Sequence, residues 1–195
     1  MTTEFTATAP GKLVVAGEYA VLDGAPAISA AVNKRAAASV RAASSGELLI
    51  ANTGLRFPFT LRMDSQPVWL NDPGDSGAVL TAVLEVLADQ HQLRTGQHPW
   101  SVELCSREFF TRLPDGSLPK LGIGSSAAIS VALLAALQSY FGKEPDFALG
   151  IAAHRKLQKG AGSGIDIATS WFGGIVLMQP VADAMPMIEQ LSWPA

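Results

Sequence analysis

The sequence predicts an α+β fold in which a mixed or antiparallel sheet packs against helices. Short alternating or apolar segments separated by turn residues fill the first 60 positions, and a clear helical period begins only at residue 77. After residue 100, expected strands and helices are interleaved. The chain has 195 residues, of which 48% are hydrophobic, enough for one sizeable core or for one core plus part of a second.

The strands are expected in pairs. Residues 5–9 and 12–16 alternate or run apolar around Pro10-Gly11, which predicts two strands joined by a turn. Residues 25–32 and 36–42 are Ala/Val-rich and are predicted as further strands. Residues 47–51 and 55–61 are predicted as a hairpin with its turn at 52–54. Later strands are expected at 100–108 and 175–179.

Four helices are expected. Apolar residues recur at helical spacing over residues 77–92, and Ser76 is the expected N-cap. Residues 125–140 form a long apolar segment that predicts a buried helix. Residues 146–158 follow Pro145, a residue favoured at helix starts, and a short helix is expected to end near Phe172 before two glycines.

Composition and charge exclude several classes of protein. Charged residues make up only 16% of the chain, the net charge is −3, and no basic stripe is present, so we expect no nucleic-acid partner. The polar start at residues 1–8 does not resemble a signal peptide. The longest apolar run, residues 127–137, is about half of a membrane span. With Cys105 as the lone cysteine, we expect a cytoplasmic protein without disulfides or membrane contact.

One glycine-rich segment has the composition of a phosphate-binding loop. In the run KLGIGSSAA at residues 120–128, Gly122 and Gly124 allow close backbone approach to a ligand, and the following helix supplies unpaired N–H groups. Ser125 and Ser126 add hydroxyls that suit phosphate or Mg²⁺. The segment fits neither a Walker A loop nor a dinucleotide-binding fingerprint, and alone a structural turn explains it equally well.

Two further segments carry charged residues beside glycines. Lys12 and Glu18 lie in APGKLVVAGEYAVLDG, residues 9–24, and Asp166 ends the run HRKLQKGAGSGID that starts at His154. Taken singly, Lys12 is typical of a solvated surface lysine. Asp166 is typical of a carboxylate at a helix start.

In this order, the three segments resemble the GHMP kinase superfamily of galactokinase, homoserine, mevalonate and phosphomevalonate kinases. The resemblance covers about residues 6–178. It implies a GHMP kinase N-terminal domain, with a fold like domain 2 of ribosomal protein S5, over residues 1–180. Residues 181–195 would then be the truncated start of a C-terminal region. The apolar ending LSWPA and the missing third glycine-rich motif suggest an absent C-terminal domain. The chain would then act alone, act with a partner that supplies this half, or be a remnant.

The resemblance also assigns site residues, with ATP and Mg²⁺ as expected cofactors. It implies that Lys12 and Asp166 are catalytic and pair with each other, and that Ser125 or Ser126 helps to hold Mg²⁺. The expected ATP-binding residues are Lys120, Gly122, Ile123, Gly124, Ser125, Ser126 and Ala127. The expected residues for a small anionic acceptor are Lys12, Glu18, Tyr19, His154, Ser163 and Gly164.

Within the superfamily, the segment A-H-x-x-x-Q…G-S-G-x-D most resembles phosphomevalonate kinases. Mevalonate kinases have a metal-binding Glu eleven residues before the aspartate, a position occupied here by Arg155. His154, Arg155, Lys156 and Lys159 form a cationic segment. Either part of this segment faces an anionic acceptor such as a phosphomonoester, or it forms a solvated helix face.

The expected function is therefore transfer of the γ-phosphoryl group of ATP to phosphomevalonate. The alternatives are a truncated remnant that binds nucleotide without turnover, or a kinase for mevalonate, homoserine or a sugar. A phosphate monoester is already mostly dianionic at pH 7 and needs no general base. With phosphomevalonate as acceptor, we therefore expect Lys12 to matter more than Asp166.

Overall fold

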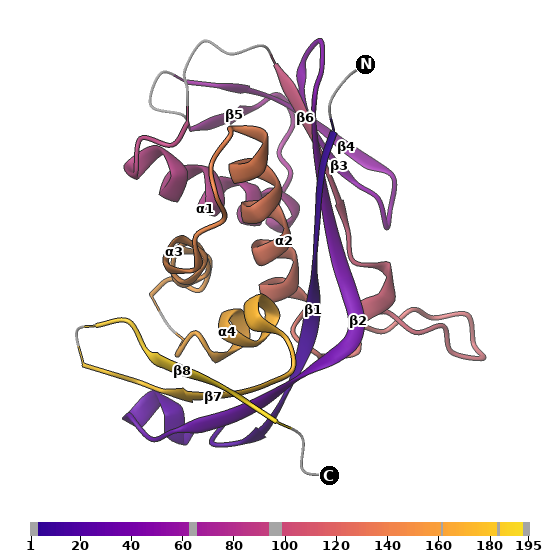
Figure 1. Ribbon diagram of the computed structural model, residues 1–195. Coiled ribbons are helices and arrows are strands. Elements are labelled where there is room, and N and C mark those ends of the chain that lie inside the picture. The colour runs from indigo at the N-terminus through magenta and orange to yellow at the C-terminus, as the bar shows by residue number, and fades with distance from the viewer. Residues whose placement is uncertain (1–3, 63–65, 94–98, 161, 183, 193–195) are drawn as a thin grey trace.

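The computed structural model describes residues 4–62, 66–93, 99–160, 162–182 and 184–192. One eight-stranded sheet runs through the chain in the order β5-β4-β3-β6-β2-β7-β8, and β1 pairs with β2. The four helices lie on one side of this sheet (Figure 1). All strand pairs are antiparallel except β3 with β6, so the expected α+β fold with a mixed, mainly antiparallel sheet is confirmed.

Two long strands replace the four short strands expected near the start. β1 is continuous over Glu4–Ala16 and β2 over Ala27–Ala42. The expected turn at Pro10-Gly11 is wrong, because both halves of β1 pair with β2. The register instead shifts there, from Pro10 opposite Arg35 to Gly11 opposite Val32. A β-bulge of this kind absorbs extra residues without reversing the chain.

The remaining strands extend the sheet on both sides. β3 (Gly46–Ile50) and β4 (Leu55–Leu61) form the expected hairpin, and the short strand β5 (Pro67–Trp69) follows. β6 (Trp100–Cys105) is shorter than expected, because residues 107–109 form a 3₁₀ turn. β7 (Ile175–Gln179) agrees with the expectation, whereas the pairing of β8 (Met187–Leu191) with β7 was not expected.

The helices form where their apolar periods indicate. α1 covers Asp75–Asp89 and has Gly74 at its N-cap, so the expected Ser76 cap is wrong. α2 covers Ser125–Tyr140 as expected. α3 covers Phe147–Leu157, and the Asp146 side chain accepts a hydrogen bond from the N–H of Ala148 at its start. α4 covers Ile165–Phe172.

The core lies between the sheet and these helices. α2 is apolar on nearly all sides and is buried along most of its length, so it forms the centre of the helical layer. A smaller apolar cluster joins α4 to β2 and β7 and includes Ile165, Ala168 and Met178. Both α2 and α4 also contact β1, the strand that carries Lys12.

Three expectations from the sequence concern membrane contact, the domain boundary and the end of the chain. No helix in the described ranges is long and apolar enough to cross a membrane. The expected domain boundary at residue 180 stays a prediction. The apolar ending of the chain includes residues 193–195, which lie outside the described residues.

Candidate functional site

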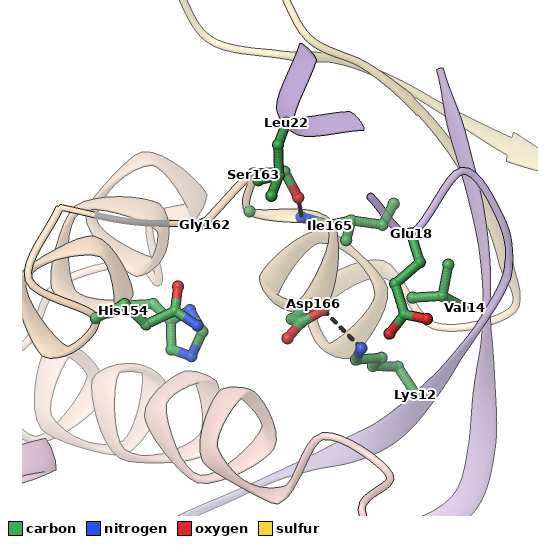
Figure 2. Close-up of a pocket in the computed structure, with 11 residues that line it drawn as sticks. Lys12, Val14, Glu18, Leu22, His154, Gly162, Ser163, Ile165 and Asp166 are labelled. Carbon is green, nitrogen blue, oxygen red and sulfur yellow. Dashed lines mark hydrogen bonds and ion pairs between the residues drawn. The ribbon is translucent and has the colours of Figure 1, made fainter. Parts of the chain in front are cut away.

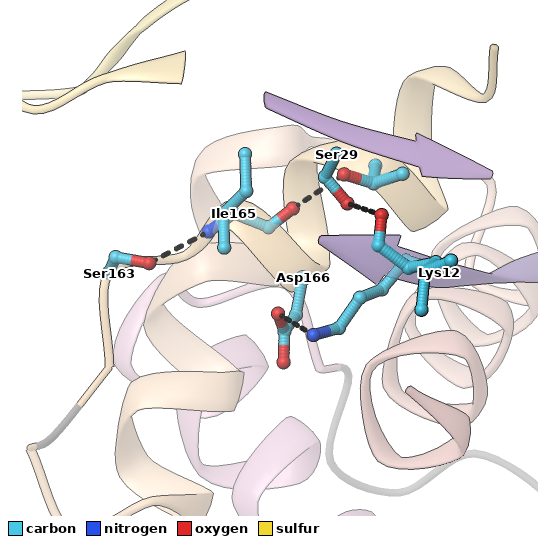
Figure 3. A network of polar contacts seen from close by, with 7 residues as sticks. Lys12, Ser29, Ser163, Ile165 and Asp166 are labelled. Carbon is cyan, nitrogen blue, oxygen red and sulfur yellow. Dashed lines mark hydrogen bonds and ion pairs between the residues drawn. The ribbon is translucent and has the colours of Figure 1, made fainter. Parts of the chain in front are cut away.

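The candidate site is centred on an ion pair between β1 and α4. The Lys12 Nζ lies 2.8 Å from the Asp166 Oδ1, and the two side chains are 13% and 29% exposed (Figures 2 and 3). The pairing expected for these residues is therefore present. Lys12 extends from the strand, whereas Asp166 lies in the first turn of α4, where the helix dipole favours a carboxylate.

The glycine-rich loop before α2 lies directly against Lys12. The backbone N–H of Lys12 donates a hydrogen bond of 2.9 Å to the carbonyl of Ile123. Gly124 has a φ of 77°, and a Cβ built there would lie 2.8 Å from the Cγ of Lys12. Only glycine combines this left-handed backbone with such a close approach. The loop and the lysine are therefore positioned by each other.

The N-terminus of α2 presents backbone donors beside this loop. The first helical hydrogen bond runs from the N–H of Ala128 to the carbonyl of Gly124 at 3.1 Å, so the preceding N–H groups have no acceptor within the helix. Ser125 is buried and Ser126 is exposed. The side chain of Ala127 belongs to the core, which leaves only its backbone for ligand contact. This geometry suits an anion such as phosphate.

A cavity of about 170 Å³ surrounds the Lys12–Asp166 pair. Four of the residues expected to bind the acceptor line it: Glu18, His154 and Ser163, which Figure 2 labels, and Gly164. Tyr19 does not line it and is 79% exposed at the surface. Five further lining residues were not expected: Val14, Leu22, Gln158, Gly162 and Ile165. Gln158 belongs to the motif A-H-x-x-x-Q…G-S-G-x-D, but the spacing of that motif does not indicate that its glutamine lines a cavity.

His154 is a buried histidine with an unpaired ring nitrogen in this cavity. His154 is only 3% exposed, and its Nε2 has no hydrogen-bond partner among the described residues. Burial lowers the pKa of His154 from its ordinary value; Asp166 opposes this shift, and Lys12 adds to it. The imidazole is therefore held neutral, and it has an unused polar atom that a ligand could satisfy.

A larger cavity, of about 980 Å³, lies beside the N-terminus of α2. Lys120, Ser125 and Ser126, three of the residues expected to bind ATP, line it. The rest of its wall comes from the β3–β4 turn, α1, the end of α3 and the segment from the end of β6 to Leu118. The unexpected lining residues include Ile50, Asn52, Val79, Leu104, Ile129 and Leu157. These positions are far apart in the sequence, so no local pattern marks them.

Charge differs between the two cavities. The larger cavity is lined by Arg107, Lys120 and Lys159 with Asp75 as its one carboxylate. The smaller cavity is lined by one lysine and two carboxylates, Glu18 and Asp166. A phosphate chain is therefore favoured in the larger cavity, and the smaller one has no surplus of positive charge.

The cationic segment of α3 does not face the smaller cavity as a group. Lys156 forms ion pairs with Asp89 at 2.9 Å and Glu85 at 3.5 Å on α1, and the hydrogen bond to Asp89 is the main cause of its raised pKa. Arg155 is exposed, and Lys159 lines the larger cavity instead. Of residues 154–159, only His154 and Gln158 line the smaller cavity, so the cations Arg155, Lys156 and Lys159 do not face an acceptor there.

The donors present fit Mg²⁺ only as an ion held largely by nucleotide phosphates. Ser125, Ser126 and Asp75 line the larger cavity. No cluster of three or more His, Cys, Asp or Glu side chains suited to a metal occurs in the described part of the chain. Mg²⁺ commonly binds through substrate phosphates with one or two protein oxygens, and this donor set meets that requirement.

Comparisons with known proteins find relatives among small-molecule kinases. Residues 82–174 match the model of the GHMP kinases N terminal domain. The chain is 30% identical over 189 residues to a mevalonate kinase of Thermococcus sibiricus, covering 94% of this chain and 54% of the relative. It is 31% identical over 182 residues to a phosphomevalonate kinase of a Streptomyces species, covering 88% of this chain and 48% of the relative.

A solved structure shows the same fold. Streptococcus pneumoniae phosphomevalonate kinase in complex with phosphomevalonate and AMPPNP superposes with a TM-score of 0.68 at 22% identity. That match covers 89% of this chain and 49% of the solved one. The chain thus spans about half the length of the curated relatives it matches.

Proposed function

Because the chain belongs to the GHMP kinase superfamily, we propose that it is an ATP-dependent small-molecule kinase whose acceptor is an intermediate of isoprenoid synthesis. The observation that carries this proposal is the Lys12–Asp166 pair, which lies in one cavity beside a glycine-rich loop that leads into a second. Phosphoryl transfer requires mainly such positioning and charge stabilisation from a protein.

The residues divide the work between the two cavities. The free N–H groups at the start of α2, together with Lys120, would bind the nucleotide phosphates. Mg²⁺ held near Ser125 or Ser126 would neutralise charge on the phosphate oxygens. Lys12 would stabilise the charge that develops on the transferred group. Nucleotide and acceptor would then meet where Gly124 contacts Lys12.

Asp166 has a role that depends on the acceptor. With a hydroxyl acceptor, the hydroxyl oxygen of the acceptor would attack the γ-phosphorus of ATP, and Asp166 would take the hydroxyl proton. The bond between the γ-phosphorus and the oxygen that bridges it to the β-phosphorus would break, and ADP would leave. With a phosphate monoester, the attacking oxygen carries no proton at pH 7, so Asp166 would orient Lys12 instead.

Two acceptors remain candidates on specific grounds. Phosphomevalonate is favoured because the segment around His154 resembles that of phosphomevalonate kinases. It is also favoured by Arg155, which occupies the position of a metal-binding Glu in mevalonate kinases. Mevalonate is favoured by the smaller cavity, where Lys12 is the one lysine opposite two carboxylates. The phosphate group of phosphomevalonate would need more positive charge than this cavity provides.

A coupled ADP-release assay tests the proposal. The purified chain is given Mg-ATP with phosphomevalonate, with mevalonate, or with no acceptor. We expect ADP release above background with one of the two acceptors. Nucleotide binding without acceptor-dependent release would favour the alternative of a non-catalytic remnant. The absence of nucleotide binding would contradict both.

A further inference from the structure

Lys159 occupies a backbone conformation that glycine normally takes. Its φ is 55°, in the left-handed region, and it directly follows the C-cap of α3 at Gln158. The N–H of Gly160 donates to the carbonyl of Arg155 at 2.8 Å, which closes the helix in the Schellman manner. The left-handed residue in this motif is usually glycine, because a Cβ crowds the following carbonyl. A lysine at this position is therefore less stable than a glycine would be.

The side chain at this position lies at the larger cavity. Lys159 lines its wall together with Lys120 and Ser125, which belong to the phosphate-loop side. In the described part of the chain, no acidic group pairs with the Lys159 ammonium. This charge is therefore available to a ligand.

The end of α3 is held in place by a neighbouring lysine. Lys156 pairs with Asp89 and Glu85 of α1, so this turn is tethered to the helix that forms another part of the cavity wall. The same turn separates the two cavities, because Gln158 lines the smaller one and Lys159 the larger one. Lys159 thus extends from a fixed position beside the expected path of the phosphates.

We propose that Lys159 is a phosphate-binding residue for the nucleotide, retained at a left-handed position at the expense of helix-end stability. This inference rests on the proposed function, and it adds a cation opposite the glycine-rich loop. Together, Lys120 and Lys159 would hold the phosphate chain from two sides. An ammonium beside a phosphate forms a charge-assisted hydrogen bond, which is stronger than a neutral one.

The chain contains a matched control for the backbone effect. His91 follows the C-cap of α1 with a φ of 52°, and it is the one other non-glycine residue with positive φ in the described ranges. The N–H of Gln92 donates to the carbonyl of Leu87 at 2.8 Å, the same helix-closing bond. His91 lines neither the 170 Å³ nor the 980 Å³ cavity. His91→Gly therefore reproduces the backbone change of Lys159→Gly without touching the nucleotide.

The experiment measures melting temperature and ligand binding on the same proteins. Both glycine variants should melt about 2–4 °C higher than the unaltered chain. In calorimetric titrations, Lys159→Gly should weaken Mg-ATP binding roughly tenfold and leave adenosine binding unchanged. His91→Gly should bind Mg-ATP like the unaltered chain, and Lys159→Arg should keep most of the affinity.

The possible failures are distinguishable. Unchanged Mg-ATP affinity in Lys159→Gly overturns the role of Lys159 and leaves the proposed function intact. An equal loss for Mg-ATP and adenosine also overturns it, since the side chain would then shape the cavity rather than bind phosphate. If the unaltered chain binds no Mg-ATP, the proposed function fails, and the role of Lys159 fails with it.

Discussion

The Lys12 ammonium lies 2.8 Å from the Asp166 carboxylate, which makes the two residues a natural pair for mutation. If the acceptor is a phosphate monoester, Lys12→Met should lower kcat far more than Asp166→Asn, because no proton has to be removed. If the acceptor is a hydroxyl, both variants should lose about a hundredfold or more. Steady-state rates of ADP release with each acceptor measure this difference.

The opposite result would contradict this role of Lys12. If Asp166→Asn lowers kcat with phosphomevalonate far more than Lys12→Met does, Asp166 acts on a phosphate acceptor by another route. Circular dichroism of both variants serves as the control for folding.

Gly124 should be required for activity because of its contact with Lys12. In Gly124→Ala, the new methyl group would lie 2.8 Å from the Lys12 Cγ and displace the lysine. We expect kcat to fall about a hundredfold, the effect of a small misplacement of a catalytic group. The measurement is kcat for ADP release, normalised to folded protein.

A matched control separates this contact from backbone strain. Gly142 has a φ of 71°, close to that of Gly124, but a Cβ there would meet nothing within 4 Å. Both alanine variants should lose about 1–2 kcal/mol of unfolding free energy, yet only Gly124→Ala should lose activity. Equal losses of activity would assign the effect to strain alone.

His154 should make the fold sensitive to mild acid. Burial lowers its folded-state pKa below the ordinary value of 6.5, so the unfolded chain binds the proton more readily. Stability should therefore fall as the pH drops below about 6.5 and level off below the folded-state pKa. His154→Leu should remove this part of the decline.

The test is urea unfolding of both proteins at pH 8, 6 and 5. The unaltered chain should lose more free energy of unfolding than His154→Leu between the first and last pH. Identical pH profiles would mean that other groups cause the acid sensitivity.

Gln138 should hold α2 to the segment after α1 and to the start of α3 through two partly buried hydrogen bonds. It is fully buried, donates to the Gln92 Oε1 at 2.8 Å and accepts from the N–H of Asp146 at 3.0 Å. Gln138→Leu would remove both hydrogen bonds and should cost about 1–3 kcal/mol. Urea unfolding measures the loss, and the exposed Gln179→Leu, expected within about 0.5 kcal/mol of the unaltered chain, is the control.

The sequence predicted most of the helices because their signals are local. α2 agrees with the prediction at both ends, since Gly124 and the apolar run that follows mark its start and length. The continuous strands β1 and β2 were missed because Pro10-Gly11 is typical of a turn. Whether such a pair turns or bulges depends on the partner strand, which no local pattern reveals.

The site was predictable where residues follow one another along the chain. The phosphate loop and the Lys12–Asp166 pair were found through motif resemblance, and the structure brings them together. Most of the wall of the larger cavity was not predicted, because residues such as Asn52, Val79 and Leu157 meet only through the fold. The direction of Lys159 was likewise undetermined, since it depends on the left-handed turn that ends α3.

The central claim is that this chain positions a nucleotide and an acceptor for phosphoryl transfer, and phosphorus NMR tests it most directly. The chain is incubated with Mg-ATP and either phosphomevalonate or mevalonate, and Lys12→Met serves as the inactive control. We predict ADP together with a new diphosphate signal from phosphomevalonate or a new monophosphate signal from mevalonate, neither of which forms with the control. A chain that binds Mg-ATP but yields no phosphorylated product with either acceptor would contradict the claim.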